Sequence, residues 1–237
     1  YEICTCLVGP EMCIRDRDRL EPFFENIPGQ WGTIWLLDGS FDNEFSYCTI
    51  KNASVGIYTT GGANFDNYKL NLSSVEVYNS SNFGVLSFSS SIDAENLVIN
   101  KSGQSSFAAT YGGKYRLNHS TISNFWNSGI RQFPSLLLNN FYIDSDDNEF
   151  INNLFDVDIT NSIIEGNQNI EFLIEKLGDA NLDYKLSNSL IKFNDINDYF
   201  DNNPIYDFSN NLYYENLFQN LSRFVLLENP QQTFRHL

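Results

Sequence analysis

The stretch VEVYNSSNFGV, residues 75–85, contains the phrase that decides the fold. An apolar residue, any residue and an asparagine are followed within a few positions by Gly84-Val85. Related phrases recur along the chain as Ile50-Lys51-Asn52, Val98-Ile99-Asn100 and Ile122-Ser123-Asn124. Their asparagines are 27, 21 and 24 residues apart. Repeats of about 20 to 30 residues built from short strands are typical of solenoids. The sequence therefore predicts a coil of strands, a scaffold that can host many activities.

The repeat phrase also predicts which side chains face the interior. Side chains alternate along a strand, so the apolar residue and the asparagine of each phrase point the same way. This parity predicts an inward column of Ile50, Val77, Val98 and Ile122. A sharp turn beside a dry core leaves backbone groups unpaired, at about 1 to 3 kcal/mol each. An asparagine amide can bond its own turn and the asparagine of the next coil. We therefore expect a structural asparagine ladder of Asn52, Asn79, Asn100 and Asn124.

The repeat defines one domain. The phrase Asn161-Ser162-Ile163-Ile164 returns 27 residues later as Asn188-Ser189-Leu190-Ile191. About seven coils fit between Trp31 and Phe193. Beyond residue 194 the repeat fades into Asp- and Asn-rich sequence with scattered aromatic residues. We expect a single solenoid domain over residues 18–237 that becomes irregular from about residue 196.

Residues 1–17 differ from the rest of the chain. They contain three of the four cysteines and show neither alternation nor the repeat phrase. Their last part, MCIRDR at residues 12–17, is similar to translated adapter sequence, so we expect residues 1–17 to be non-native and unstructured. The native N-terminus and any signal peptide would then be missing. The remaining cysteine, Cys48, is expected to be a buried small hydrophobe rather than a nucleophile or metal ligand.

Composition limits the partners. The chain has 30 acidic and 14 basic side chains and a net charge of −16, which repels nucleic acids and anionic membranes. No apolar run approaches the roughly 18 residues that a membrane span needs. We expect neither a nucleic-acid partner nor a transmembrane segment.

Two runs outside the repeats carry a family resemblance. DRLEP at residues 18–22 and PGQWGTIW at residues 28–35, together with the repeat phrases, resemble the right-handed parallel β-helix repeat proteins exported by bacteria. The likeness covers about residues 18–237, and residues 29–32 (GQWG) are its most specific part. It implies an all-β, single-stranded right-handed parallel β-helix, secreted or on the outer cell surface. The family's closing C-terminal elements are absent, so the resemblance also implies a fragment clipped at both ends. Open coil ends are expected to associate or aggregate.

Outward residues of the coils are candidates for carbohydrate binding. The residue after each Gly-Ile equivalent is expected to point outward in one column of Tyr58, Leu86, Ala108 and Arg131. Aromatic rings beside one arginine suit sugar stacking and carboxylate pairing. The candidate binding residues are Tyr58, Tyr111, Trp126 and Arg131. The alternative is that these side chains only cover the outer faces of strands.

Evidence for catalysis is weaker. The best metal-site candidate is the acidic run Asp144, Asp146 and Asp147, which would suit Ca²⁺, the one cofactor considered. Its spacing lacks the glycine turn and terminal glutamate of a helix–loop–helix calcium site, and a solvated loop is the alternative. We favour a non-enzymatic surface scaffold that binds carbohydrate or adheres. The alternative is a polysaccharide lyase or glycoside hydrolase, which would need carboxylates and a basic residue converging in an exposed groove.

Overall fold

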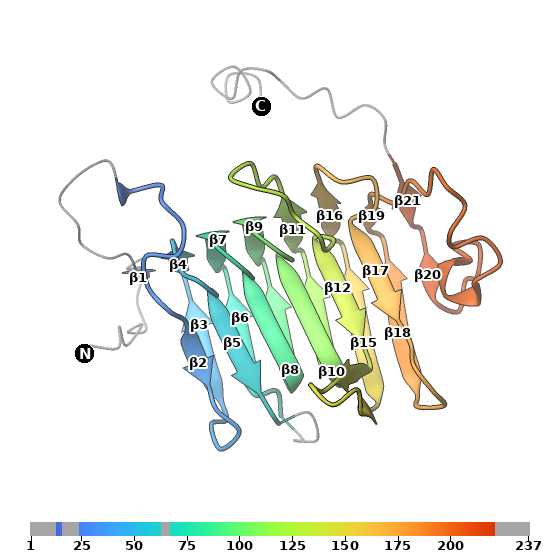
Figure 1. The fold of residues 1–237 in the computed structure, drawn as a ribbon, viewed down its shortest axis with the longest axis horizontal. Coiled ribbons are helices and arrows are strands. Elements are labelled where there is room, and N and C mark those ends of the chain that lie inside the picture. The colour runs from blue at the N-terminus through green and yellow to red at the C-terminus, as the bar shows by residue number, and fades with distance from the viewer. Residues whose placement is uncertain (1–12, 16–23, 63–66, 221–237) are drawn as a thin grey trace.

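The computed structural model describes residues 13–15, 24–62 and 67–220 of the 237-residue chain. Over these residues the protein is all-β, with parallel strands arranged in two large sheets (Figure 1). The described part contains no α-helix, and its helical element η2 (Pro204–Tyr206) is a single 3₁₀ turn. Among these residues, no helical element has the length and apolarity that a membrane crossing requires.

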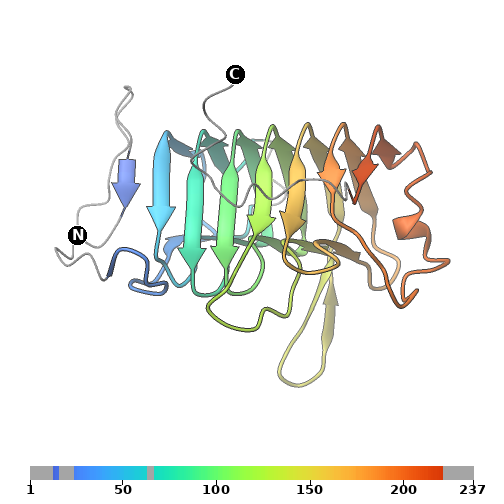
Figure 2. The same cartoon turned by 90° about the horizontal axis from the view of Figure 1, so that it is seen from above.

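The first sheet is a row of parallel strands that Figure 2 shows side by side. Within the described residues its order is β1 (Cys13–Arg15), β4 (Cys48–Lys51), β7 (Glu76–Ser80), β9 (Val98–Ser102), β11 (Thr121–Asn124), β16 (Ile163–Gly166), β19 (Leu190–Ile191) and β21 (Phe218–Gln219). Each strand is separated in sequence from its neighbour by strands of the second sheet. The chain therefore passes alternately between the two sheets and advances one strand position on each pass.

The second sheet has two halves that follow each other along the chain. Its main path in the described residues is β2 (Ile34–Leu36), β5 (Ile57–Thr60), β8 (Val85–Glu95), β10 (Phe107–Asn118), β15 (Leu154–Thr160), β18 (Leu182–Ser187) and β20 (Tyr214–Glu215). The shorter strands β3 (Asn43–Ser46), β6 (Leu70–Ser73), β12 (Leu136–Asn139) and β17 (Phe172–Glu175) complete it. The first half contains β2, β5, β12 and β17, and the second half contains β3, β6, β15, β18 and β20. The long strands β8 and β10 span both halves; β8, for instance, pairs first with β5 and then with β6.

The inward column runs through the first sheet almost as predicted. Strand pairing places Ile50, Val77, Ile99, Ile122, Ile164 and Ile191 directly over one another. All six are at most 2% exposed. The prediction for Val98 is wrong, because Val98 is 37% exposed and Ile99 takes the inward place. The register pairs Tyr78 with Asn100, so the winding from β7 to β9 is one residue longer than the spacing of Asn79 and Asn100 suggested.

This one-residue shift also shortens the asparagine ladder. Asn79 Nδ2 donates to Asn52 Oδ1 at 2.6 Å, as expected of the ladder. Asn100 lies outside it and accepts the backbone N–H of the next winding at Phe125. Asn124 bonds the backbone of the preceding winding instead of another asparagine. The expected ladder of four is therefore one asparagine–asparagine bond, although Asn124 satisfies turn backbone groups as predicted.

The corner from the second sheet to the first is a single residue in the left-handed conformation. Its φ lies between 48° and 56° at Tyr47, Ser74, Asn96, His119, Asn161, Asn188 and Asn216. Such angles strain most side chains but suit asparagine, which fills four of these places. The backbone ladder continues through the corner, for instance from Asn161 N–H to the Ser187 carbonyl at 3.1 Å.

A buried hydroxyl follows this corner in several windings. Ser162 Oγ accepts the Ser120 backbone N–H at 3.1 Å and donates to the Thr160 carbonyl at 2.7 Å. Ser189 repeats both bonds one winding later. Cys48 holds the same place after Tyr47, is 4% exposed and donates its thiol to the Ser46 carbonyl. The prediction of a buried Cys48 is confirmed.

Three residues of the leading segment belong to the first sheet. Cys13–Arg15 forms β1 and pairs in parallel with β4, Cys13 opposite Cys48. This strand differs from the unstructured segment expected over residues 1–17. The rest of that segment lies outside the described residues, so its non-native origin stays a prediction.

An aromatic cluster closes the C-terminal end of the first half of the second sheet. The rings of Phe193, Phe200, Tyr206, Phe208 and Tyr214 contact one another between β19 and β20. The Tyr206 hydroxyl accepts the backbone N–H of Ile174 at 3.1 Å and donates to its carbonyl at 2.7 Å. Ile174 lies in β17, so this hydroxyl satisfies the two groups that another strand would have paired.

We expect Tyr206→Phe to lower the free energy of unfolding by about 1 to 3 kcal/mol, because both Ile174 groups lose a buried partner while the ring packing remains. Urea denaturation at neutral pH measures this. The control is Tyr199→Phe, whose side chain is 79% exposed. Equal stability of the two variants would contradict the role given to the hydroxyl.

Candidate functional site

A groove of about 700 Å³ lies on the outer face of the first half of the second sheet. We call it the aromatic groove. Its lining includes four aromatic rings, one carboxylate and two aliphatic hydroxyls, supplied by Trp35, Tyr58, Phe88, Tyr111, Asp38, Thr60 and Ser89.

Strand alternation places these rings outside. In β2 and β5, Ile34 and Ile57 pair in register and face inward, so the next pair, Trp35 and Tyr58, faces outward. Their rings stack with centroids 5.2 Å apart and planes inclined by 23°. One strand further, Phe88 is opposite Thr60 in register. These rings thus come from three consecutive windings, and Tyr111 adds a fourth.

Tyr111 reaches the groove from a bend in β10. Its φ is 59°, and the register between β10 and β8 shifts between Thr110 and Gly113. This irregularity is a bulge of the kind that re-aims side chains. The Tyr111 ring packs against Phe88 with centroids 5.1 Å apart.

A hairpin adjoins this end of the groove. The antiparallel strands β13 (Phe141–Ile143) and β14 (Glu149–Ile151) extend away from the two sheets (Figure 2). Tyr142 of β13 contacts Phe88 and Tyr111, with centroids 5.1 and 4.9 Å away, and stacks on Phe150 at 4.7 Å. The hairpin therefore buttresses the two rings that end the groove.

The structure brings together two of the four predicted binding residues. Tyr58 and Tyr111 both line the aromatic groove, whereas Trp126 and Arg131 are not among its lining residues. The outward column runs through Tyr58, Leu86 and Ala108 as predicted, but its next member is Leu137. Arg131 leaves the column because it belongs to the connection between β11 and β12.

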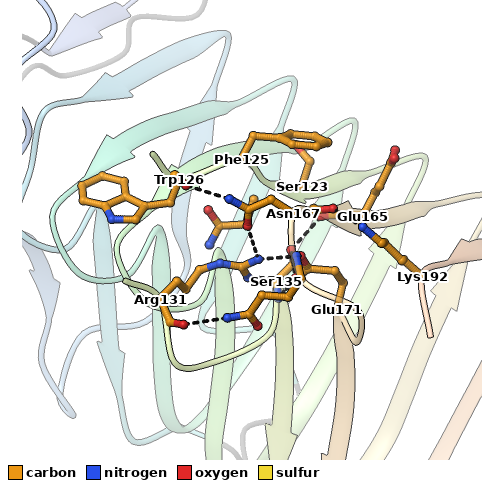
Figure 3. Close-up of polar contacts among 12 residues, drawn as sticks. Ser123, Phe125, Trp126, Arg131, Ser135, Glu165, Asn167, Glu171 and Lys192 are labelled. Carbon is orange, nitrogen blue, oxygen red and sulfur yellow. Dashed lines mark hydrogen bonds and ion pairs between the residues drawn. The ribbon is translucent and has the colours of Figure 1, made fainter. Parts of the chain in front are cut away.

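Arg131 is instead buried in an ion pair with Glu171 (Figure 3). Its Nη1 and Nη2 donate to Glu171 Oε2 and Oε1 at 2.8 and 2.5 Å, and the side chains are 2% and 0% exposed. Glu171 also accepts the Ser135 backbone N–H and hydroxyl at 2.8 Å each, and the Gln168 N–H at 2.7 Å. Both carboxylate oxygens of Glu171 therefore accept hydrogen bonds from groups of the protein itself.

Trp126 belongs to the same anchored connection. Trp126 is only 8% exposed, and its backbone carbonyl accepts a hydrogen bond from Asn167 Nδ2 at 2.7 Å. Asn167 Oδ1 in turn accepts Arg131 Nη2 at 2.8 Å. These contacts join the β11–β12 connection to the β16–β17 connection. The sequence contained one sign of this arrangement, since Glu171 interrupts an apolar run with a charge that needs a partner.

The acidic run forms the turn of the β13–β14 hairpin. Asp144 Oδ1 accepts the backbone N–H groups of Asp146 and Asn148 at 2.9 Å each, and Asn148 Nδ2 also donates to both oxygens. These bonds, led by the Asn148 side chain, lower the pKa of Asp144. Asp147 has a φ of 62° in the turn. In the described part of the chain no group of three or more His, Cys, Asp or Glu side chains is arranged to hold a metal. Calcium binding by Asp144, Asp146 and Asp147 stays a prediction.

A second polar feature was not anticipated from the sequence. Asp93, Arg116, Asp158 and Lys185 follow one another in register across the second half of the second sheet, and we call them the charged column. Arg116 forms a bidentate ion pair with Asp93, and Lys185 forms an ion pair with Glu215 at 2.7 Å. This alternation of charge cannot be predicted from the sequence, because it appears only when the strand register is known.

Asp158 is the unusual member of the charged column. Its neighbours Arg116 and Lys185 each form an ion pair with another acidic side chain. Among the described residues, the Asp158 carboxylate has no ion pair or side-chain hydrogen bond. Partial burial raises the pKa of Asp158, and the negative charge of Asp156 raises it further. Asp156 itself pairs with Lys114 at 2.8 Å. The ring of Tyr68 lies beneath the Lys114 ammonium at 4.9 Å.

Comparison of the chain with protein-family models, with curated proteins and with solved structures finds no match, so function must be argued from the geometry.

We expect Glu171→Gln to lower the free energy of unfolding by about 3 to 5 kcal/mol, because Arg131 would keep a buried charge without its counter-ion. Urea denaturation measures the loss. Glu149→Gln, at an exposed position of β14, removes the same charge as a control. If both variants unfolded at the same urea concentration, the structural role of the pair would be wrong.

Proposed function

We propose that the protein is a right-handed parallel β-helix of about seven coils that acts outside the cell as a carbohydrate-binding or adhesive scaffold without catalysis. The regular passage between two parallel sheets supports the coil. The exported location rests on the sequence resemblance alone.

The aromatic groove carries the binding proposal. Flat aromatic faces bind the C–H faces of sugar rings, and Trp35, which stacks on Tyr58 at the groove, supplies an exposed ring for such a contact. Trp35 remains 54% exposed, although burial of so large a ring is favourable. A volume of about 700 Å³ suits an oligosaccharide segment, since small-ligand sites range over about 300 to 1,000 Å³.

The groove is also preorganised. Its rings stand on strands whose alternate residues, such as Ile34 and Ile57, pack into the core, and neighbouring rings hold one another. A ligand that binds a fixed surface avoids the entropy cost of ordering it. Polar atoms at the rim, such as the Thr60 hydroxyl, can meet sugar hydroxyls.

We expect Tyr58→Ala to weaken binding of an oligosaccharide at least about tenfold, which corresponds to about 1.4 kcal/mol. A glycan array would select the ligand, and isothermal titration calorimetry would measure its affinity. Tyr199→Ala removes an exposed tyrosine outside the groove and should leave affinity unchanged. An array without any binding, or equal affinities of both variants, would refute the proposal.

The charged column favours a second candidate, a polysaccharide-degrading enzyme. Asp158 combines an uncommitted carboxylate and a raised pKa with basic side chains at Arg116 and Lys185 in register on either side. A carboxyl with a raised pKa can act as a general acid, and this constellation is typical of catalytic sites as well as of ion-pair networks.

If the second candidate holds, Asp158→Asn should abolish release of reducing ends or unsaturated products from polysaccharides. A general acid must be protonated, so the rate should fall as pH rises through the raised pKa of Asp158. Asp146→Asn, in the hairpin turn, should retain activity. Absence of products from the unmodified protein across a polysaccharide panel would eliminate this candidate.

A further inference from the structure

The charge of the aromatic groove indicates what kind of glycan it takes. Asp38 is the one charged side chain among its described lining residues, and it is exposed. A Cβ at Gly61 would lie 2.9 Å from Asp38 Cγ, so the glycine makes room for the carboxylate. Building on the proposed function, we propose that the groove binds a glycan with free amino groups and that Asp38 is the counter-ion of a sugar ammonium.

Asp38 lies where a bound cation would also meet aromatic rings. Burial raises the pKa of Tyr58, and the negative charge of Asp38 raises it further. The carboxylate therefore lies within electrostatic reach of the Tyr58 hydroxyl. Tyr58 in turn stacks on Trp35. An ammonium beside the faces of these rings gains about 0.5 to 2 kcal/mol in addition to its attraction to a carboxylate.

Lys69 does not neutralise this site by direct pairing. Its Nζ donates to the carbonyls of Leu37 and Thr60 at 2.5 Å each, and the residue is 0% exposed. Burial lowers the pKa of Lys69, and the charge of Asp38 opposes that shift. No ion pair links Lys69 to Asp38 among the described residues. The lysine therefore braces the backbone behind the groove, and the outer side of Asp38 stays available.

The rest of the molecule argues against an acidic sugar. Arg131, the cation expected to pair with a sugar carboxylate, is buried against Glu171 away from the groove. The chain has 30 acidic and 14 basic side chains, so its field attracts cationic polymers and repels polyuronates. Of the two charged classes, the amino-bearing one matches both the local and the overall charge.

The test uses titration calorimetry with three oligosaccharides of equal length: a glucosamine oligomer, its N-acetylated counterpart and a galacturonate oligomer. We expect the order of affinity to be glucosamine, then N-acetylglucosamine, with the galacturonate weakest. Asp38→Asn should weaken glucosamine binding on the order of tenfold and leave N-acetylglucosamine binding unchanged. Added salt should weaken only the binding of the glucosamine oligomer. Asp183→Asn, at an exposed position of β18, removes the same charge and should change neither affinity.

The outcomes separate this inference from the proposed function. If Tyr58→Ala weakens binding but Asp38→Asn does not change the preference for amino over N-acetyl sugars, the inference is wrong and the carbohydrate site stands. Tighter binding of the galacturonate oligomer would also overturn it. If none of the three oligomers binds and a glycan array is blank, both proposals fail.

Discussion

Parallel pairing of each winding with the next, maintained through the corners, is the constraint on which the rest of this structure depends. At the corner from the second sheet to the first the chain turns within one residue, and the backbone ladder continues there. The left-handed residues between the two sheets, such as Asn161 and Asn188, provide this turn. The hydroxyls of Ser162 and Ser189 then satisfy the adjacent buried backbone groups. Once the corners repeat, the apolar column from Ile50 to Ile191 follows from alternation.

The same constraint creates both outward surfaces, the aromatic groove and the charged column. Residues that alternate with the core must face outward, and pairing stacks them in columns across windings. In the first half of the second sheet this brings Trp35 beside Tyr58, and in the second half it sets Asp93, Arg116 and Asp158 in a row. One surface is aromatic with a single acid, and the other alternates in charge. Their chemistry therefore comes from residues far apart in sequence.

The sequence was sufficient for the class of fold because strand alternation and repeat spacing are local properties. The prediction placed Ile50, Val77 and Ile122 correctly but chose Val98 instead of Ile99, since Asn100 lies one residue out of register with Asn79 and with Asn124. An asparagine can serve a turn from either neighbouring position, so it does not fix the register.

The candidate site was only half predictable. Tyr58 was found because outward residues can be read from parity, whereas Tyr111 was named only as an aromatic residue near that column and reaches the groove through the bulge in β10. Arg131 was misplaced, because its position depends on Glu171, 40 residues later, and the distance between them cannot be known before the windings are stacked. The charged column was missed for the same reason. Long-range pairs become predictable only after the register is known.

The β13–β14 hairpin shows how freely such an architecture can acquire new features. Ala109 and Gly113 of β10 are four residues apart, yet their partners Leu138 and Leu154 in the next winding are sixteen apart. The additional residues leave between two strands and return without displacing the pairing on either side. Evolution or engineering could therefore exchange this appendage for another loop and reshape the rim of the neighbouring surface while the underlying frame stays the same.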